Sequence, residues 1–267
     1  MRSCELIVMG GGRMGEALLG GLLRGPLSAE RVLVIEPVSA RRGELGAAYP
    51  GLRSAAALTG DERADGAVIA VKPQHVEAAC RAVGPLVPRA LSIAAGVTIA
   101  SLQAWLGPHV AVVRSMPNTP ALVGAGASGL AGAATAAADD VAWAHAILSS
   151  VGVVATVTET LLDAVTGLSG SGPAYVFLVA EAMIEAGVLV GLPRDTASLL
   201  ARQTILGAAR LLSESGERPE VLRADVTSPG GTTAAGLRAL EDHGVRAAFM
   251  DAVSAATDRA RALGRLT

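Results

Sequence analysis

The sequence predicts an α/β domain with a doubly wound, mostly parallel sheet, followed by an all-α domain. Two observations lead to this fold class. Up to about residue 160, short apolar runs alternate with helical stretches, which is the rhythm of successive βαβ units. Beyond that point the pattern becomes helix after helix, interrupted by glycine and proline. We therefore divide the chain into one domain over residues 1–160 and another over residues 161–267.

Short β-rich runs in the first domain are the predicted strands. Their almost continuous apolar character is typical of parallel strands that are buried on both faces. They cover residues 5–9, 32–36, 67–71, 91–94, 110–114 and 153–157. The stretches between them predict helices over residues 14–24, 39–48, 74–83, 101–106 and 139–150.

The second domain is predicted to contain only helices. Glycine, proline and polar residues mark breaks at residues 170–173, 191–193, 216–219, 228–231 and 243–244. The helices expected over residues 174–190 and 195–212 are apolar on more than one face. A domain of about 100 residues buries little of such surface by itself. We therefore expect an all-α dimerisation domain that covers these helices with a second copy of the chain.

Composition excludes several classes of protein. The chain has 267 residues, of which 51% are hydrophobic and 17% charged, and its net charge is -2, which disfavours a disordered chain or a polybasic tail. Aromatic residues make up 2%, so few rings are present to stack on bases. Proline, glycine or glutamate interrupts each long uncharged stretch, and the N-terminus has the pattern of a strand. We expect neither a nucleic-acid partner nor a membrane.

Metal and disulfide chemistry are also not expected. Cys4 and Cys80 are too few for a disulfide framework or a thiolate metal site, which favours a reducing, cytoplasmic location. The four histidines are scattered without the spacing of metal ligands. No Gly-x-Ser-x-Gly sequence is present to mark a hydrolase nucleophile.

A glycine-rich loop with the sequence GGGRMG follows the first predicted strand and opens the first helix. It matches GxGxxG: Gly10 permits the tight turn, Gly12 lets the backbone approach a pyrophosphate, and Gly15 lets helix and strand pack closely. The free N–H groups at the helix start then face the anion. The loop predicts a Rossmann-type dinucleotide-binding domain, in which Arg13 and Met14 also contact the cofactor.

An acidic residue follows the second predicted strand. Glu36 comes 21 positions after Gly15, where a carboxylate accepts hydrogen bonds from the adenosine ribose and repels a 2′-phosphate, which favours NADH. Arg41 and Arg42 follow closely, and a guanidinium pairs well with a phosphate, so NADPH stays open. Both arginines are equally compatible with a solvated helix face.

The carboxyl ends of the third and fourth predicted strands complete the expected cofactor crevice, because ligands of open α/β sheets bind beyond these ends. The residues concerned are Ala70, Val71, Lys72, Pro73, Ala94, Ala95 and Gly96. Small side chains here let a flat ring lie against the backbone. Pro73 suits the first turn of the next helix, and Lys72 is expected to face the cofactor rather than act as an acid.

Three longer motifs, together with the glycine loop and the tripeptide VKP at residues 71–73, resemble one family over essentially the whole chain. They are RSMPNTP at residues 114–120, DAVTGLSGSGPAY at residues 163–175 and VTSPGGTT at residues 226–233. The family is pyrroline-5-carboxylate reductase, the last enzyme of proline biosynthesis. The resemblance implies hydride transfer from NADPH or NADH to the C=N carbon of (S)-1-pyrroline-5-carboxylate, which gives L-proline.

The resemblance also implies a substrate site. Thr233 is expected to place its hydroxyl on the ring nitrogen, and the carboxylate is expected to be held by Ser228, Gly230, Gly231 and Thr232. From the residues alone, Ser228 and Pro229 resemble an N-cap and a first-turn proline, and the glycines expose backbone N–H groups.

The opposite wall of the substrate site is expected to be formed by the turn over residues 170–173, which contains Ser171, near Ser169. Glu159 is a weaker candidate for ligand contact, and Asp163 fits a helix start. Asn118 fits either a cofactor contact or a turn cap. The family further implies a dimer and leaves open a decamer of five dimers. A relative of β-hydroxyacid dehydrogenases and a non-catalytic dinucleotide sensor remain the alternatives.

Overall fold

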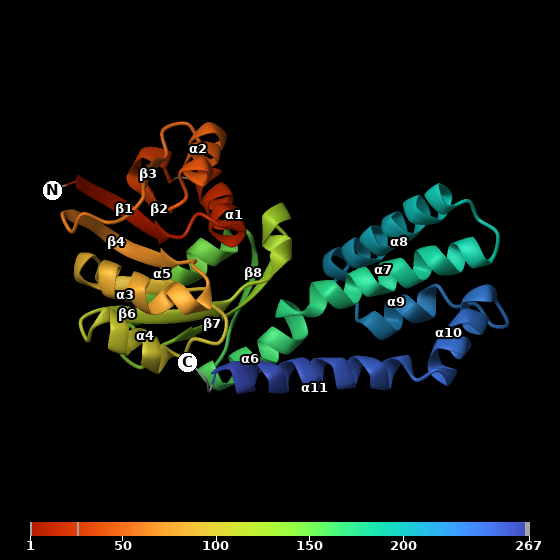
Figure 1. Cartoon of the computed structure of the whole chain (residues 1–267). Helices are drawn as coiled ribbons and strands as arrows, with labels where there is room; N and C mark the ends of the chain where they lie inside the picture. Colours follow the sequence, from red (N-terminus) through yellow and green to blue (C-terminus); the bar gives the residue numbers. More distant parts are fainter. Residues whose placement is uncertain (1, 26, 265–267) are drawn as a thin grey trace. The chain divides into compact units, whose positions relative to one another are not determined.

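A computed structural model describes residues 2–25 and 27–264 (Figure 1). The described residues form two compact units, one made of Met1–Ser171 with Ser254–Thr267 and the other of Gly172–Val253. The domain boundary near residue 160 stays a prediction, and residues 161–171 and the end of the last helix pack with the first unit.

The first unit is built on one sheet, with the strand order β3-β2-β1-β4-β5-β6-β7-β8 among the described residues. The strands are β1 (Arg2–Met9), β2 (Val32–Ile35), β3 (Arg53–Ala55), β4 (Glu62–Ile69), β5 (Arg89–Ser92), β6 (Ala111–Met116), β7 (Gly126–Gly132) and β8 (Gly152–Thr156). Neighbours pair in parallel except β6 and β7, which are antiparallel. The prediction of a doubly wound, mostly parallel sheet is confirmed.

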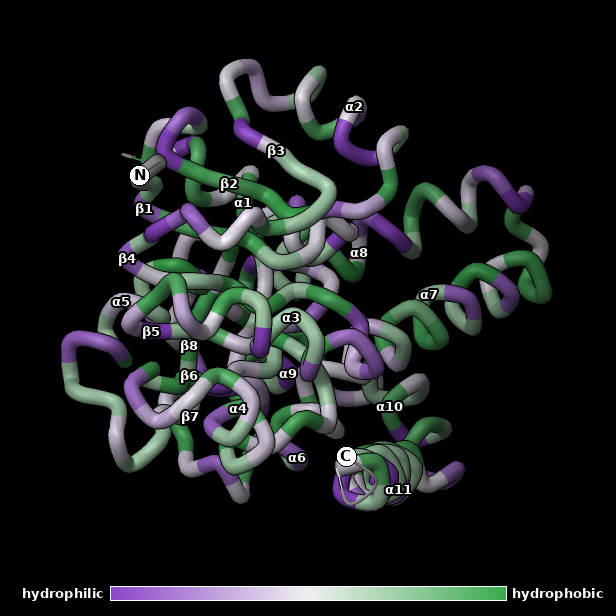
Figure 2. Tube along the Cα trace, turned by 60° about the vertical axis from the view of Figure 1, so that its left-hand side comes forward, coloured by the Kyte–Doolittle hydropathy of each residue, from purple (hydrophilic) through white to green (hydrophobic). Residues whose placement is uncertain are grey.

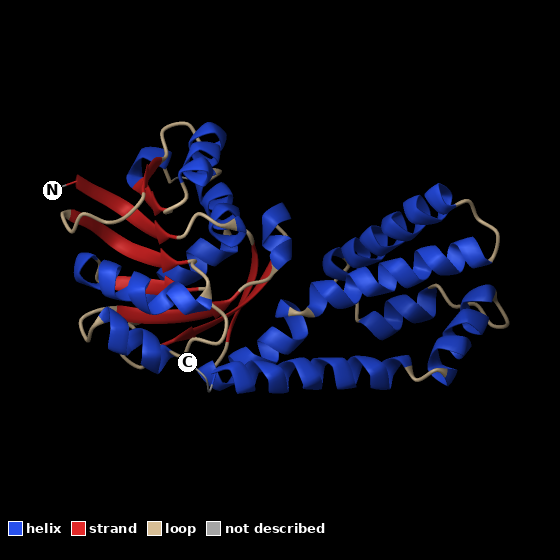
Figure 3. Ribbon diagram, viewed as in Figure 1, coloured by secondary structure: helices blue, strands red, loops and turns tan. Residues whose placement is uncertain are grey.

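Helices cover both faces of this sheet (Figure 3). They are α1 (Arg13–Leu23), α2 (Ser39–Ala48), α3 (Val76–Val83), α4 (Ile99–Leu106) and α5 (Ala138–Ser149). Successive side chains of a strand point to opposite faces, so β1 serves two cores. Ile7 packs in the core beneath α3 and α4, whereas Leu6 and Val8 pack in the core beneath α1 and α5.

Two strands, β3 and β7, were not predicted. β7 has the sequence GASGLAG, which lacks the β-branched and aromatic residues that mark strands. It forms a strand because β6 and β8 bond its two edges. Its small residues also allow close packing: a Cβ on Gly129 would lie 2.8 Å from the Val165 side chain. β3 is only three residues long, too short to give a periodic pattern.

The second unit is all-helical in its described residues, as predicted. Its helices are α7 (Gly172–Leu189), α8 (Arg194–Glu214), α9 (Pro219–Asp225), α10 (Thr232–Asp242) and the first part of α11 (Val245–Gly264). α7 buries none of its residues within the chain, and Figure 2 shows long apolar stretches along it. Phe177 and Leu178 are among its exposed apolar side chains.

The break predicted over residues 170–173 is wrong. Two short helical segments, η5 (Glu159–Leu161) and α6 (Leu162–Val165), lead into a π-helical turn, η6 (Thr166–Gly170). The amide of Ser171 donates to the Thr166 carbonyl oxygen at 2.9 Å, and α7 follows directly. Glycine and proline do not interrupt the helix here, because the wider π-helical turn accommodates them.

This continuity produces one helical run, Glu159–Leu189, that is long and apolar enough to cross a membrane by length and composition. Its most apolar 18-residue window has a mean hydropathy of 1.4, and none of that window is buried within the chain, although Leu162 near the start of the run is buried. The expectation that no such stretch occurs is therefore wrong. An apolar helix face of this kind is also what a chain presents to a second copy of itself.

Glu62, at the start of β4, is a buried carboxylate with several donors. The hydroxyl of Thr59 donates to Oε1 at 2.8 Å, and the Gly60 amide donates to Oε2 at 2.9 Å. Burial acts to raise the pKa of Glu62, but these hydrogen bonds outweigh it and lower the pKa to about 2. The charged form therefore stabilises the turn before β4.

We predict that Glu62→Gln lowers the free energy of unfolding by about 1–3 kcal/mol at neutral pH, because donors placed for a carboxylate lose part of their acceptor. The contribution of Glu62 is complete above the ordinary glutamate pKa of about 4.3 and is lost as the pH falls toward about 2. Urea unfolding of both proteins from pH 7 to pH 3 measures this. A difference that does not shrink on acidification would contradict the assignment.

Candidate cofactor and substrate site

The strand order reverses direction between β1 and β4, and the loops at the carboxyl ends of these strands surround a hollow of about 420 Å³. Ligands of open α/β sheets bind at such a switch point. The hollow is lined by Gly12, Arg13, Met14, Ala70, Val71, Lys72, Pro73, Ile93, Ala94, Ala95, Met116, Pro117, Asn118, Thr119 and Gly170. Most of the residues predicted to bind the cofactor thus lie together, although they come from separate segments of the chain.

The glycine loop has the close packing that its spacing predicts. Gly10 adopts φ +105°, and a Cβ there would lie 2.8 Å from the Ala70 carbonyl oxygen. A Cβ on Gly15 would lie 2.3 Å from the Gly10 carbonyl oxygen. Only glycine therefore lets the start of α1 approach the end of β4 so closely.

Gly12 differs from its neighbours because a Cβ there would meet no atom within 4 Å and would project into the hollow. It is also the N-cap of α1, and no side chain caps the first N–H groups of that helix. Free amides at a helix start together with open space in front of them suit a pyrophosphate. The residues present therefore fit a dinucleotide.

Glu36 follows β2 beside the loop and is 9% exposed. Its Oε2 accepts the Gly11 amide at 3.0 Å, and its Oε1 accepts the Val38 amide at 3.0 Å. Arg41, on α2, donates from Nε to the Gly11 carbonyl oxygen at 2.8 Å. The structure thus holds both predicted residues against the second glycine of the loop.

The loop after β4 carries Lys72 and Pro73. Lys72 is the N-cap of the 3₁₀ segment η2 (Pro73–His75), and Pro73 occupies its first turn, as predicted. Both residues line the hollow.

Gly96 lies elsewhere. With φ +77° it faces Leu263 and Gly264 of α11, and it lines a smaller hollow of about 240 Å³ with Arg114, Asp163 and Arg261. Ala94 and Ala95 line the cofactor hollow without it.

Glu159 connects three elements of the first unit. Its Oε1 accepts the Ile99 amide at 2.7 Å and Nη1 of Arg114 at 2.9 Å. Arg114 is 8% exposed, so this is a buried charge whose partner must stay in place. These contacts of the Glu159 carboxylate hold the start of α4 and the end of β6, and thus the loop that carries Ala94 and Ala95.

Asn118 lies in the wall of the hollow and is 8% exposed. Its Nδ2 donates to the Ser169 carbonyl oxygen at 3.0 Å, and its Oδ1 accepts the Ala127 amide at 2.8 Å. The side chain therefore joins the 3₁₀ segment η4 (Thr119–Val123), strand β7 and the π-helical turn. The Ser169 hydroxyl donates to the Val165 carbonyl oxygen at 3.0 Å.

Five lining residues were not nominated as cofactor contacts from the sequence: Ile93, Met116, Pro117, Thr119 and Gly170. Met116 is the last residue of β6, and Pro117 and Thr119 follow it inside the motif at residues 114–120. The position of that motif after a strand was the signal available for them. Gly170 comes from the π-helical turn, whose place beside β6 depends on the Asn118 contact rather than on local sequence.

The residues expected to bind the substrate carboxylate lie in the second unit, at the start of α10. Ser228 is not the N-cap that the sequence predicts. The N-cap is Gly231, whose amide donates to the Ser228 carbonyl oxygen at 3.0 Å. Gly230 adopts φ +69°, which cannot continue a helix, so α10 begins later, at Thr232. Thr232 is exposed and Thr233 is half-buried.

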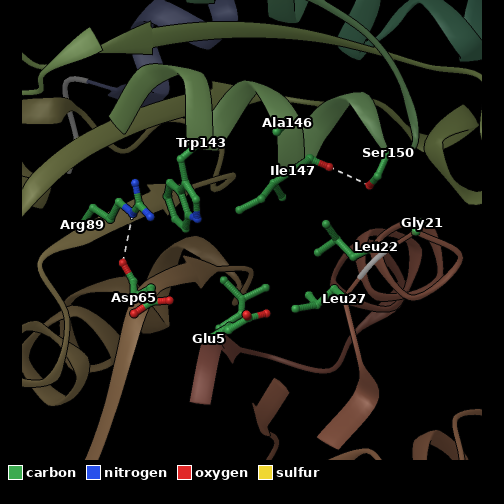
Figure 4. Close-up of a pocket in the computed structure, with 12 residues that line it drawn as sticks. Glu5, Gly21, Leu22, Leu27, Asp65, Arg89, Trp143, Ala146, Ile147 and Ser150 are labelled. Carbon is green, nitrogen blue, oxygen red and sulfur yellow. Dashed lines mark hydrogen bonds between the residues drawn. The ribbon is translucent and has the colours of Figure 1, made fainter. Parts of the chain in front are cut away.

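Another hollow, of about 350 Å³, lies toward the amino-terminal ends of the strands (Figure 4). Arg89 stacks over the Trp143 ring at 4.8 Å and donates from Nε to the Asp65 carbonyl oxygen at 3.0 Å. Glu5 is paired with Arg31. None of the predicted site residues lines this hollow.

Two family models match the chain. Residues 159–263 match the pyrroline-5-carboxylate reductase dimerisation family, and residues 5–96 match the NADP oxidoreductase, coenzyme F420-dependent family. Among curated proteins, a pyrroline-5-carboxylate reductase of Synechocystis is 45% identical over 266 residues, which is 98% of this chain and 99% of the relative.

Solved structures agree. A pyrroline-5-carboxylate reductase of Coxiella burnetii is 35% identical, with a TM-score of 0.90 over 98% of this chain and 99% of the other. The pyrroline carboxylate reductase of Plasmodium falciparum, solved with NADP bound, is 31% identical, with a TM-score of 0.83 over 98% of both chains. Near-complete coverage by sequence and structure leads to one conclusion: the chain belongs to the pyrroline-5-carboxylate reductase family.

Proposed function

We propose that this chain reduces the C=N bond of (S)-1-pyrroline-5-carboxylate with NADPH or NADH and releases L-proline. The observation that carries the proposal is the hollow at the sheet switch point, where an uncapped helix start and Gly12 leave room for a pyrophosphate. The substrate is inferred from membership of the pyrroline-5-carboxylate reductase family, which extends over nearly the whole chain. When bound, the reduced nicotinamide supplies the hydride.

For the cofactor, we assign each part of the hollow a separate task. The amides of Gly12, Arg13 and Met14 hold the pyrophosphate. Ala94 and Ala95 present small side chains, which lets a flat ring approach the backbone. Asn118 keeps the wall in place through its bonds to Ser169 and Ala127 and is thus a positioning residue.

For the substrate, we assign the carboxylate to the start of α10. The first amides of a helix have no partner within it. The Gly231 amide is used by the turn to Ser228, so the amides of Thr232 and Thr233 remain for an anion, with Ser228, Gly230 and Gly231 shaping the turn around it. Ser169 and Ser171 are assigned to the opposite wall, as the family resemblance implies.

Thr233 is the proposed catalytic residue, because its hydroxyl is assigned to the ring nitrogen. The imine carries its proton when hydride arrives, so the protein needs to orient the ring rather than protonate it. A hydroxyl oxygen accepts a hydrogen bond from such an N–H group. Glu159 is assigned no ligand, because its carboxylate accepts hydrogen bonds from Ile99 and Arg114.

Self-association follows from the match of residues 159–263 to a dimerisation family. The exposed apolar surface of α7 supports the same conclusion. A decamer of five dimers and a cytoplasmic location belong to the proposal. The buried, unpaired thiols of Cys4 and Cys80 support a reducing compartment.

Turnover tests the function directly. Purified protein is expected to oxidise NADH or NADPH only when pyrroline-5-carboxylate is present, with L-proline appearing in equal amount. Dinucleotide binding without this reaction would indicate a non-catalytic sensor. Reduction of NAD+ or NADP+ by a β-hydroxyacid would instead indicate the dehydrogenase relative. Absorbance at the nicotinamide band, with chromatographic detection of proline, measures both.

Gly12→Val tests the loop. The Cβ of the valine meets no protein atom within 4 Å, and the side chain occupies space in front of the helix start, so we expect dinucleotide affinity to fall by about 100-fold or more while the fold is retained. Gly46→Val on α2 is the matched control, because a Cβ there also meets nothing within 4 Å. Isothermal titration with NADH and NADPH measures both variants. Affinity unchanged by Gly12→Val would refute the loop assignment.

Thr233→Ala tests the substrate contact. We expect kcat to fall by about 10- to 100-fold because the ring loses its orienting hydroxyl, while dinucleotide affinity stays within about twofold. Thr233→Ser keeps the hydroxyl and should restore most of kcat. Equal losses in kcat and cofactor affinity, or no rescue by serine, would count against the assigned role.

A further inference from the structure

The choice between NADH and NADPH is left open by the glycine loop and depends on the residues around the adenosine ribose. We infer that this chain selects NADH, that Glu36 is the specificity-determining residue, and that Glu16 and Glu44 withhold Arg41 from a 2′-phosphate. The inference rests on the cofactor use proposed above. It differs from what the NADP family matched by residues 5–96 would suggest.

Glu36 is fixed in place by its own backbone. Its amide donates to the Ala55 carbonyl oxygen at 3.0 Å, which anchors it to the end of β3. Its carbonyl oxygen accepts Nη1 of Arg42 at 2.7 Å. With the Gly11 and Val38 amides on the carboxylate, the side chain has little freedom to move away from an approaching ligand.

The carboxylate can still accept further hydrogen bonds. Each carboxylate oxygen has two lone pairs, and each oxygen of Glu36 uses one of them for an amide. The remaining lone pairs suit donors such as the two hydroxyls of a ribose. A 2′-phosphate replaces a donor by an acceptor group with a charge of about −1.5 to −2, which the carboxylate repels.

Arg41 is the cation best placed to compensate for this repulsion, and it is already engaged. Nη1 donates to Glu44 Oε2 at 2.7 Å, Nη2 donates to Glu16, and Nε donates to the Gly11 carbonyl oxygen. The hydrogen bonds with Glu44 and Glu16 raise the pKa of the Arg41 guanidinium. A phosphate at this position would have to displace two carboxylates from their arginine.

Arg42 is engaged as well. Its Nη1 donates to the carbonyl oxygens of Glu36 and Pro37, at 2.7 and 2.8 Å, and so closes the turn after β2. The cluster therefore contains three carboxylates, Glu16, Glu36 and Glu44, against two guanidiniums. Its charge favours a ligand that brings hydroxyls over a ligand that brings another phosphate.

The first experiment uses the unaltered full-length protein. Isothermal titration gives the Kd of NADH and NADPH, and then of AMP and adenosine 2′,5′-bisphosphate, which differ only by the 2′-phosphate. We expect both 2′-phosphorylated ligands to bind at least about 10-fold more weakly than their partners. Equal or tighter binding of NADPH and of the bisphosphate would overturn the inference. Failure of every dinucleotide to bind would instead overturn the proposed function.

Variants then identify the residues responsible. Glu36→Gln removes the charge and keeps the shape, and it should bring the two dinucleotide Kd values within about threefold of each other. Glu44→Gln removes the charged partner of Arg41 Nη1. It should lower the Kd of NADPH by about two- to fivefold without changing the Kd of NADH. Glu77→Gln removes an exposed carboxylate on α3 and should change neither value. An unchanged NADH preference in Glu36→Gln would contradict the role of Glu36.

Discussion

The structure depends on one close approach of backbone to backbone. The Gly10 amide donates to the Ile35 carbonyl oxygen at 2.9 Å, and the Ala70 amide donates to the Met9 carbonyl oxygen at 2.8 Å, so the loop after β1 is held between β2 and β4. There is no room for a side chain at Gly10 or Gly15. The start of α1 is therefore set directly over the sheet switch point, and Gly12 is the position left facing open space. This packing creates the open space in front of the helix start where we propose that the cofactor binds.

The rest of the cofactor hollow is held by side chains that the sheet itself does not supply. Asn118 joins the segment after β6 to β7 and to the π-helical turn, and Glu159 joins the start of α4 to Arg114. Asn118 is buried, and Glu159 accepts hydrogen bonds from Ile99 and from the buried Arg114. Loss of either side chain would leave its hydrogen-bond partners unsatisfied in the wall. Asn118 and Glu159 thus hold the wall of the hollow in place. Both were candidates for ligand contact in the sequence, but in the structure they form hydrogen bonds with other parts of the protein.

Much of the first unit could be predicted because short stretches of the sequence determine its strands and its glycine loop. Apolar runs such as residues 32–36 become buried parallel strands, and the GxGxxG spacing fixes the loop after β1. β7 could not be predicted, because its glycines form a strand only between β6 and β8. Ser228 was expected to cap α10, but the left-handed Gly230 delays the helix. The contacts of Arg41 with Glu16 and with the Gly11 carbonyl oxygen depend on α1 and α2 coming together, which no local pattern shows.

We propose that the amides at the start of α1 and the carboxylate of Glu36 bind the two ends of the adenosine diphosphate part of a nicotinamide dinucleotide. A crystal structure of the protein with NADH measures this most directly. The account predicts the pyrophosphate within hydrogen-bond distance of the amides of Gly12, Arg13 and Met14, with the adenosine ribose hydroxyls on Glu36. A dinucleotide bound elsewhere, for example against Trp143 at the opposite end of the strands, would contradict it.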